Sequence, residues 1–508
     1  MTKRDRPART PEPKPASAAP AKPQRLLPTL SEILDPKGPF FVPLVMLLIA
    51  RVVAFANLPN ASEDAYITFR YAKHLATGNG LVFNPGETVM GYTSPLWVMW
   101  CALGSALGQA PVLWTRIASL VADVVTLLVM AQLLRRHASV LSAAAFGVFF
   151  AAWPYFSAVA ASGMENNLML MLIVLAAALV ARRSVFSGPV MAALALVRPE
   201  GIVSAAVLAV GASWRDRIVA LVLAVSGWGA MAMVHGSWLP QSVTAKASLY
   251  GTPGPWAGRH WWEWMSPIQF GRWPATGEGN MLVMLAVVIA PAFVLGLIAL
   301  WRQRDSALAR AVAAALVVWL GYASLGVAFF MWYLLVPLAG IAAAAAVGLP
   351  HVAPSRALQI ALALMVVGTW PVAQTLYLGR AQNEYFAFSG TAAYLRDHAT
   401  PGQSVMLEPI GIVGYQCPLV VIDEVGLVSP DVAARRLKGP GWYSDIVAAR
   451  KPDWIAIRRS SREASAAFAG VGAPFRNAAE QSAVFALYEL VHVADPGRSD
   501  IEIFRRVP

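Results

Sequence analysis

The sequence predicts a polytopic α-helical membrane protein that ends in a small α/β domain. Of its 508 residues, 57% are hydrophobic and only 13% are charged, and the mean hydropathy is +0.55. Apolar segments of about 20 residues recur along the chain, which is the length that crosses a hydrocarbon layer roughly 30 Å thick. After about residue 376 the pattern changes to short β-like runs that alternate with helical stretches.

Residues 1–38 precede these segments and are rich in Pro, Ala, Lys and Arg. A segment of this composition buries too little apolar surface to fold, so we expect a disordered basic tail on the cytoplasmic side. The first apolar run starts near Phe40, and we therefore expect no cleavable signal peptide. The net charge of +12 would suit nucleic acid, but the basic residues cluster in this tail and in short loops between apolar runs. Membrane topology explains that distribution better, so we expect no nucleic-acid partner.

Apolar runs that can span a membrane follow one another along the chain. They cover residues 40–58, 112–134, 139–157, 164–181, 217–235, 281–300, 308–327, 329–348 and 355–375. Residues 186–213 are interrupted by Arg198, Pro199 and Glu200. They fit two short helices that meet there, because Pro disrupts a helix interior. Residues 95–109 fit a juxtamembrane or re-entrant helix instead of a crossing.

The positive-inside rule tests this assignment. With two short crossings over residues 186–213 and none over residues 95–109, the basic pairs of the short loops all lie on one side, as Arg135 and Arg136 illustrate. The result is about eleven transmembrane helices in a bacterial cytoplasmic membrane, with the N-terminus in the cytoplasm and the C-terminus outside.

The expected organisation is a transmembrane module over residues 39–380, with outer loops at 59–111 and 236–280. A periplasmic or extracellular α/β domain follows over residues 381–508. Its β-like runs are Ser404–Leu407, Leu419–Asp423, Asp453–Arg458 and Ile501–Phe504.

Glu63 and Asp64 lie side by side just after the first apolar run. Two adjacent carboxylates at a membrane surface can serve as a general base or as ligands for a cation. They can also be solvated charges that flank the membrane. A helix from Asp64 to Leu75 would carry an apolar stripe through Ile67 and Tyr71 and lie on the membrane with its polar face outward. Asp64 would then stand in the first turn, where the helix dipole favours a negative charge.

Three runs of the first outer loop carry a resemblance to a known family. They are Glu63-Asp64-Ala-Tyr66-Ile with Phe69-Arg70-Tyr71-Ala, Gly80-Leu-Val-Phe-Asn84-Pro85-Gly86-Glu87, and Gly91-Tyr92-Thr93-Ser94-Pro95-Leu96-Trp97. Later motifs follow in the same order: Ser162-Gly163-Met164-Glu165, Arg198-Pro199-Glu200-Gly201, Leu239-Pro240-Gln241 with Ala245-Lys246, and Asp423-Glu-Val-Gly426-Leu427. Together they resemble the GT-C glycosyltransferases, in particular the branch that includes the actinobacterial terminal arabinofuranosyltransferases.

The resemblance implies a membrane enzyme of the GT-C fold. Such an enzyme takes a sugar from a polyprenyl-phosphate carrier at the outer face and passes it to an acceptor hydroxyl of a cell-envelope glycan or lipid. A pentose such as arabinofuranose is the sugar that this branch suggests. In the family an Asp of the first loop is the catalytic base, and Asp64 holds the matching position. Glu63 stands where many relatives have a second Asp.

The residues themselves fit this chemistry. Transfer with inversion needs a carboxylate to take the proton from the acceptor hydroxyl, and cations to stabilise the departing lipid phosphate. Asp64 with Glu63 supplies the carboxylate. The candidate phosphate ligands are Arg198, Lys246 and Arg259, although a lone basic residue at a membrane boundary also serves as an interfacial anchor. The candidate substrate contacts are Tyr66, Arg70, Tyr92, Glu165, Glu200 and His260.

Several alternatives stay open at this point. His260 lies in a Trp-rich segment, residues 255–273, which fits an interfacial belt or a sugar-stacking wall. No His spacing indicates a zinc site. A divalent cation such as Mg²⁺ or Mn²⁺, placed between the acidic pair and the donor phosphate, is left open. The rival functions are a transporter or flippase of a lipid-linked sugar, and a non-catalytic envelope protein of the same fold.

Arg51 and Asp123 are charged residues inside apolar runs. At about 1.5 Å per residue, each lies roughly 16 Å from one end of its run, near mid-membrane. A lone charge there is costly, so we expect the two side chains to pair and to hold the bundle together. Arg116 lies two turns from Asp123 on the same face and is the competitor for this pairing.

Overall fold

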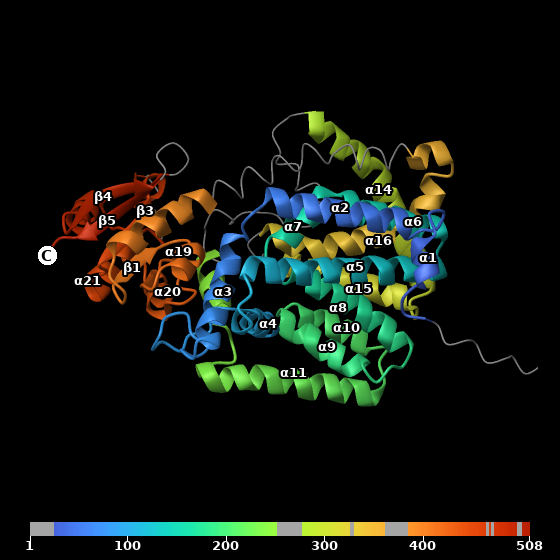
Figure 1. Ribbon diagram of the computed structural model, residues 1–508, viewed down its shortest axis with the longest axis horizontal. Helices are drawn as coiled ribbons and strands as arrows, with labels where there is room; N and C mark the ends of the chain where they lie inside the picture. Colours follow the sequence, from blue (N-terminus) through green and yellow to red (C-terminus); the bar gives the residue numbers. More distant parts are fainter. Residues whose placement is uncertain are drawn as a thin grey trace, which may run out of the picture.

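A bundle of apolar helices forms the larger part of the computed structural model, and a sheet with its own helices packs at one end of the bundle (Figure 1). The structure describes residues 25–250, 277–325, 330–360, 385–463, 467–468, 472–494 and 500–508. The helices up to residue 352 are α1 (Leu30–Leu34), α2 (Phe41–Asn57), α3 (Glu63–Ala76), α4 (Pro95–Ala106), α5 (Pro111–His137), α6 (Val140–Ala152), α7 (Pro154–Ala161), α8 (Asn166–Ala181), α9 (Ser187–Val197), α10 (Gly201–Ala209), α11 (Trp214–His235), α12 (Gln241–Tyr250), α14 (Gly277–Arg302), α15 (Ala307–Leu325), the 3-10 helix η2 (Met331–Leu334) and α16 (Leu335–Val352).

Helices of membrane-spanning length and composition occur in the described part of the chain. Three qualify: α5, α11 and the segment Trp332–Val352, which contains α16. The pair α6 and α7 makes a fourth if it is taken as one span, and it bends by 55° where Pro154 begins α7. Shorter apolar helices of 10–17 residues complete the bundle. These helices identify a membrane protein, and the eleven crossings stay a prediction.

The break expected within residues 186–213 is present. α9 ends at Val197, Arg198 has an extended backbone, and α10 begins at Gly201. The two short helices pack against each other. A side chain at Gly201 would overlap the Leu194 carbonyl oxygen, so only glycine allows this close turn.

The predicted pair of charges inside the bundle is confirmed. Arg51 donates to Asp123 at 2.6 Å, and both side chains are fully buried. The remaining polar atoms are also satisfied, because Arg51 donates to the Ser157 hydroxyl at 2.6 Å and Asn167 donates to Asp123 at 2.7 Å. Arg116 does not compete, since it donates to main-chain carbonyls at the end of α2 and at Ala161.

The C-terminal region is built on a five-stranded mixed sheet in the order β2-β1-β3-β5-β4. β1 pairs in parallel with β2 and β3, whereas β5 is antiparallel to both β3 and β4. β1, β2, β3 and β5 occupy the four β-like runs of the sequence, and β4 corresponds to none of them. The elements are β1 (Ser404–Leu407), α19 (Gly411–Gln416), β2 (Val420–Asp423), α20 (Pro430–Arg436), α21 (Trp442–Arg450), β3 (Trp454–Arg458), α22 (Arg459–Glu463), α23 (Ala478–Phe485), β4 (Tyr488–Ala494) and β5 (Ile501–Arg506).

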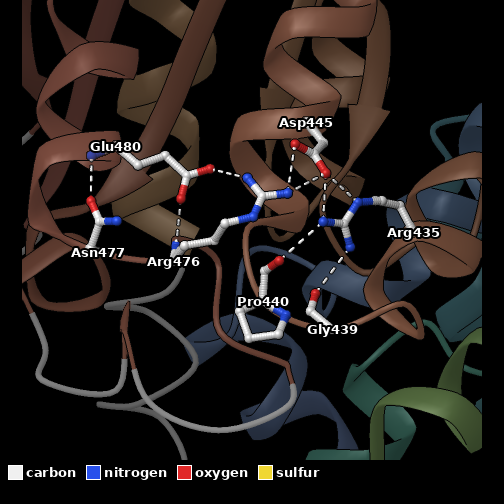
Figure 2. A network of polar contacts seen from close by, with 7 residues as sticks. All are labelled: Arg435, Gly439, Pro440, Asp445, Arg476, Asn477 and Glu480. Carbon is white, nitrogen blue, oxygen red and sulfur yellow. Dashed lines mark hydrogen bonds and ion pairs between the residues drawn. The ribbon is translucent and has the colours of Figure 1, made fainter.

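A network of ion pairs holds the outer helices of this region together (Figure 2). Asp445 of α21 accepts from Arg435 of α20 at 2.5 Å and from Arg476 at 2.9 Å. Arg476 also pairs with Glu480 of α23, whose first turn is capped by the Asn477 side chain. Three helices are thereby joined through two carboxylates, Asp445 and Glu480.

The position of α3 corrects the sequence-based expectation. α3 does not lie on the membrane with a polar face outward, because every residue from Ala65 to Ala72 is buried. It stands between the bundle and the C-terminal region (Figure 1). Its apolar side chains share one core with α4 and with Val413 and Val428. An amphipathic pattern alone could not distinguish burial against protein from burial against lipid.

Replacing Arg51 or Asp123 with Ala is expected to cost about 3–5 kcal/mol of unfolding free energy each, because each change leaves the other charge buried without its partner. The double variant is expected to lose clearly less than the sum, as measured by denaturant titration in detergent. Arg51→Ala combined with a change at the exposed Asp397 is the control, and its costs should add. Additive losses for Arg51 and Asp123 would contradict the pairing.

The carboxylate of Asp445 is expected to stabilise the C-terminal region only while it is ionised. Burial works against the charge, but hydrogen bonds from Arg435 and Arg476 lower the pKa of Asp445 below its ordinary 3.8. Its contribution is therefore present above about pH 3.8 and is lost as the pH falls through the lower native pKa. The melting temperature of Asp445→Asn should lie below that of the wild type at neutral pH and approach it in acid. Asp397→Asn should show no such pH-dependent gap.

Candidate active site

Glu63 and Asp64 form the first turn of α3. Ser62 precedes them, and its backbone amide donates to the Ser162 carbonyl at 2.8 Å, which ties the helix start to the bundle. Asp64 is partly exposed, and no hydrogen bond or ion pair reaches its side chain from the described residues. Glu63 is engaged instead: its Oε1 accepts from the backbone amides of Gly411 and Ile412 at the start of α19. The two adjacent acids therefore have different surroundings.

Electrostatics separates the two acids further. Burial raises the pKa of the Glu63 carboxyl well above its usual range, and the charges of Asp64 and Glu408 raise it more. The amides of Ile412 and Gly411 work in the opposite direction without reversing the shift. Glu63 therefore holds a proton more tightly than an ordinary glutamate side chain does.

Two acids of the C-terminal region, Glu408 and Glu424, interact with each other, and Glu408 also interacts with Asp64; sequence reasoning missed both. Burial raises the pKa of Glu408, although part of its side chain is exposed, and the charges of Asp423 and Asp64 add to the shift. Burial and Glu408 together raise the pKa of Glu424 to about 8. Glu424 at least lies in the motif that begins at Asp423, whereas no pattern pointed to Glu408.

Asp423 itself has a structural role. It is fully buried, and its carboxylate accepts from the backbone amides of Val425 at 2.9 Å, Val428 at 3.2 Å and Leu427. These bonds close the turn after β2. The motif from Asp423 to Leu427 is therefore a turn that the Asp423 carboxylate stabilises.

Arg70, a candidate substrate contact, is buried in the protein. Its guanidinium donates to the Phe83 carbonyl at 2.6 Å, to the Leu419 carbonyl at 2.7 Å and to the Gly414 carbonyl. Asn84 completes the group at 3.3 Å. Arg70 therefore joins the first loop to the C-terminal region. These contacts support a structural role for Arg70.

Asn84 precedes a turn and also binds the edge of the C-terminal sheet. Its side-chain amide accepts from the Val421 amide at 3.0 Å and donates to the Val421 carbonyl at 2.8 Å. β2 is an edge strand, so Asn84 pairs with the sheet edge as another strand would. Gly86, with a φ of +89°, forms the turn that follows.

The two candidate tyrosines have different surroundings: Tyr66 belongs to α3, and Tyr92 belongs to the loop that follows it. Tyr66 is buried, and its ring lies 5.6 Å from that of Tyr415. The Tyr92 hydroxyl lies 3.0 Å from Nε2 of His235, at the end of α11. The Tyr92 ring also meets the Tyr71 ring edge-on at 4.9 Å. These contacts connect the first loop to its neighbours.

Arg198, Glu165 and Glu200 come together in one buried cluster. Arg198 donates to Glu200 at 2.5 Å and also pairs with Glu165, and the Tyr322 hydroxyl donates to Glu200. The Arg198 guanidinium lies over the Tyr333 ring at 5.2 Å. One positive charge therefore faces two carboxyl groups, so this arginine is already neutralised.

An aromatic row connects this cluster to Lys246. Lys246 of α12 lies over the Phe330 ring at 4.4 Å. The Phe330 ring lies 5.5 Å from that of Tyr333, which stacks on Tyr322 at 4.9 Å. Lys246 thus lies over the first ring of this row, and Arg198 lies over the neighbouring ring of Tyr333. The other two candidates on this loop, Arg259 and His260, lie outside the described residues.

The turn that carries Glu165 packs directly under α3. Gly163 has a φ of +80°, and a Cβ there would lie 3.0 Å from Ala61 and 3.2 Å from Ala65. The Trp97 indole donates to the Gly163 carbonyl at 3.1 Å. The start of α3 and the Arg198 cluster are therefore positioned by the same turn.

The described residues form no metal site from protein ligands alone. No group of three or more His, Cys, Asp or Glu side chains there could hold an ion. Glu63 also directs one oxygen to two backbone amides. We therefore assign no step to the divalent cation that the sequence left open.

Comparison with solved structures identifies the fold. The chain is similar to ArnT from Cupriavidus metallidurans bound to undecaprenyl phosphate, with a TM-score of 0.59 and 13% identity over 91% of this chain and 97% of that one. The apo form of the same protein gives 0.54 and 12% over the same shares. This similarity confirms the GT-C fold that the motifs predicted.

Other comparisons cover less. Arabinofuranosyltransferase AftD from Mycobacteria is 18% identical over 92% of this chain and 40% of its own length, at a TM-score of 0.44, which is too low to carry an argument. A family model described as a domain of unknown function (DUF8728) matches residues 375–504. No curated protein matches the sequence.

Arg70→Lys is expected to weaken the docking of the C-terminal region, because a single ammonium cannot reach acceptors that lie around a planar guanidinium. Hydrogen bonds from charged groups contribute about 1.5–3 kcal/mol each, so a loss of about 3 kcal/mol is expected in denaturant titrations. Arg396→Lys, on the exposed surface, is the control and should have little effect. Wild-type stability in Arg70→Lys would reopen a substrate role for this residue.

Proposed function

We propose that the chain is a glycosyltransferase that moves a sugar from a polyprenyl-phosphate carrier to an acceptor hydroxyl. Asp64 carries the proposal, because it is a partly exposed carboxylate without a hydrogen-bonding or ion-pair partner in the described part of the chain. It stands at the N-terminus of α3, on a fold shared with a protein whose structure holds undecaprenyl phosphate. A carboxylate that is open to solvent can accept the proton of an acceptor hydroxyl that lies within hydrogen-bond reach.

The proposed reaction is a single displacement. Asp64 takes the proton from the acceptor hydroxyl while the acceptor oxygen attacks the anomeric carbon. The new carbon–oxygen bond forms on the face opposite the phosphate. The bond from that carbon to the phosphate oxygen breaks, and polyprenyl phosphate leaves with the electron pair. The configuration at the anomeric carbon is thereby inverted.

Lys246 and Arg259 are the residues that we assign to the donor phosphate. Lys246 is a point charge that lies over the Phe330 ring. Arg198 is already paired with two carboxyl groups and would bind a phosphate only after losing one of them. We therefore give Arg198 the supporting role of holding the turn at Glu165 in place.

The substrates and the location follow from the motifs and the charge distribution. The first-loop motifs favour a pentose such as arabinofuranose as the sugar and a cell-envelope glycan or lipid as the acceptor. By the positive-inside rule, the basic loops favour a bacterial cytoplasmic membrane with the N-terminal tail in the cytoplasm and the C-terminal region outside. Membrane lipids would contact α11, which exposes Leu221, Val222 and Met233.

A transporter or flippase of a lipid-linked sugar is the second candidate, and the described charges disfavour it. A transport pathway needs ionisable groups that face a water-filled route. In the described bundle, Arg51 and Asp123 are instead fully buried and paired.

Asp64→Asn is expected to lower transfer at least a hundredfold, because it removes the general base and leaves the shape almost unchanged. Turnover would be measured with the purified full chain and a panel of synthetic polyprenyl-phosphate sugars, with folding followed by thermal melting. Asp397→Asn, at an exposed position, is the matched control. Full turnover in Asp64→Asn would remove the base assignment, and movement of lipid-linked sugar across vesicles without transfer would favour the flippase.

A further inference from the structure

Glu63 bridges two segments that lie far apart in the sequence. Its Oε1 accepts from the Gly411 amide and, at 3.0 Å, from the Ile412 amide, across 348 and 349 positions of chain. Its Oε2 is buried and has no hydrogen-bond partner. The Glu63 side chain thus points at the backbone of α19. It is not an open carboxylate.

Glycine makes this contact possible. A Cβ at Gly411 would overlap the Glu63 carbonyl oxygen and would lie 2.8 Å from Glu63 Oε1. Two more glycines of the same interface have no room for a side chain. A Cβ at Gly414 would lie 2.9 Å from Phe83, and one at Gly91 would lie 2.5 Å from Val428. The first loop and the C-terminal region therefore pack closely at all three glycines, and at Gly411 the backbone itself meets the backbone of Glu63.

We propose that Glu63 is a positioning residue that sets where Asp64 stands. The first turn of α3 is held from the bundle side by Ser62 and from the C-terminal side by Glu63. Since no described side chain holds Asp64 itself, the backbone of this turn determines its direction. The inference rests on the proposed function, in which Asp64 is the base, and it makes residues 411–412 part of the catalytic unit.

The rival view is that Glu63 acts in the chemistry through its charge. The Glu63→Gln variant separates the positioning role from a role of the charge. Glutamine keeps an oxygen that accepts from the two amides, but its side chain cannot ionise. Glu63→Ala removes the acceptor altogether. The ionisable groups that face Glu63 are Asp64 from α3 and Glu408 from the end of β1, and both remain in each variant.

The test combines amide hydrogen exchange with turnover, using the full chain in detergent. In Glu63→Ala, exchange at Gly411 and Ile412 should rise about tenfold, the fold-change that corresponds to one lost hydrogen bond. Its kcat should fall about a hundredfold, because a displacement of about 1 Å costs that much, while the KM for a polyprenyl-phosphate sugar stays within about twofold. Glu63→Gln should recover most of both properties.

Gly411→Ala should behave like Glu63→Ala, since it separates the same two backbones. Gly472→Ala is its matched control, because nothing lies within 4 Å of a Cβ at that position. A Gly472→Ala variant with wild-type exchange and turnover is the expected result.

Two outcomes overturn the proposal. In the first, Glu63→Gln is as inactive as Asp64→Asn but keeps wild-type exchange at Gly411. This result would mean that Glu63 acts through its charge. Wild-type exchange in Glu63→Ala would mean that the contact holds nothing in place. A failure of the proposed function is separate: it appears as full transfer by Asp64→Asn, a result that does not depend on exchange at residues 411–412.

Discussion

The docking of α3 between the bundle and the C-terminal region is the constraint on which the candidate site depends. Arg70 lies at its centre, where one buried guanidinium donates to carbonyls of the first loop and of residues 414 and 419. An arginine without acceptors would be very costly at this depth. Because the acceptors come from both segments, the first loop and the C-terminal region take up their final positions together.

The pairing of buried charges separates the structural residues from the candidate catalytic residue. Arg51 is matched by Asp123, and Arg198 by Glu165 and Glu200. Removing Arg51, Asp123 or Arg198 would leave a buried charge uncompensated. Asp64 has no such partner in the described residues and stays partly exposed. A carboxylate that the fold does not use is available to a substrate.

Local patterns predicted a large part of the fold. The break at Pro199 and the start of α5 near residue 112 follow from proline chemistry and from apolar length, which act within a few residues. The pairing of Arg51 with Asp123 also came from local reasoning, because an apolar bundle leaves a charge few alternatives. The environment of α3 was wrong, since its stripe of Ile67 and Tyr71 fits protein as well as lipid.

The sequence by itself determined the helical membrane fold and the strands at residues 404–407 and 420–423, and it singled out the pair Glu63 and Asp64 as candidates. Only the tertiary structure decided what surrounds each acid. Glu63 meets Gly411, Arg70 meets Gly414, and Asn84 meets Val421 across more than three hundred residues. No periodicity or spacing records such contacts, because they depend on how two distant segments close on each other and on which polar atoms that closure buries.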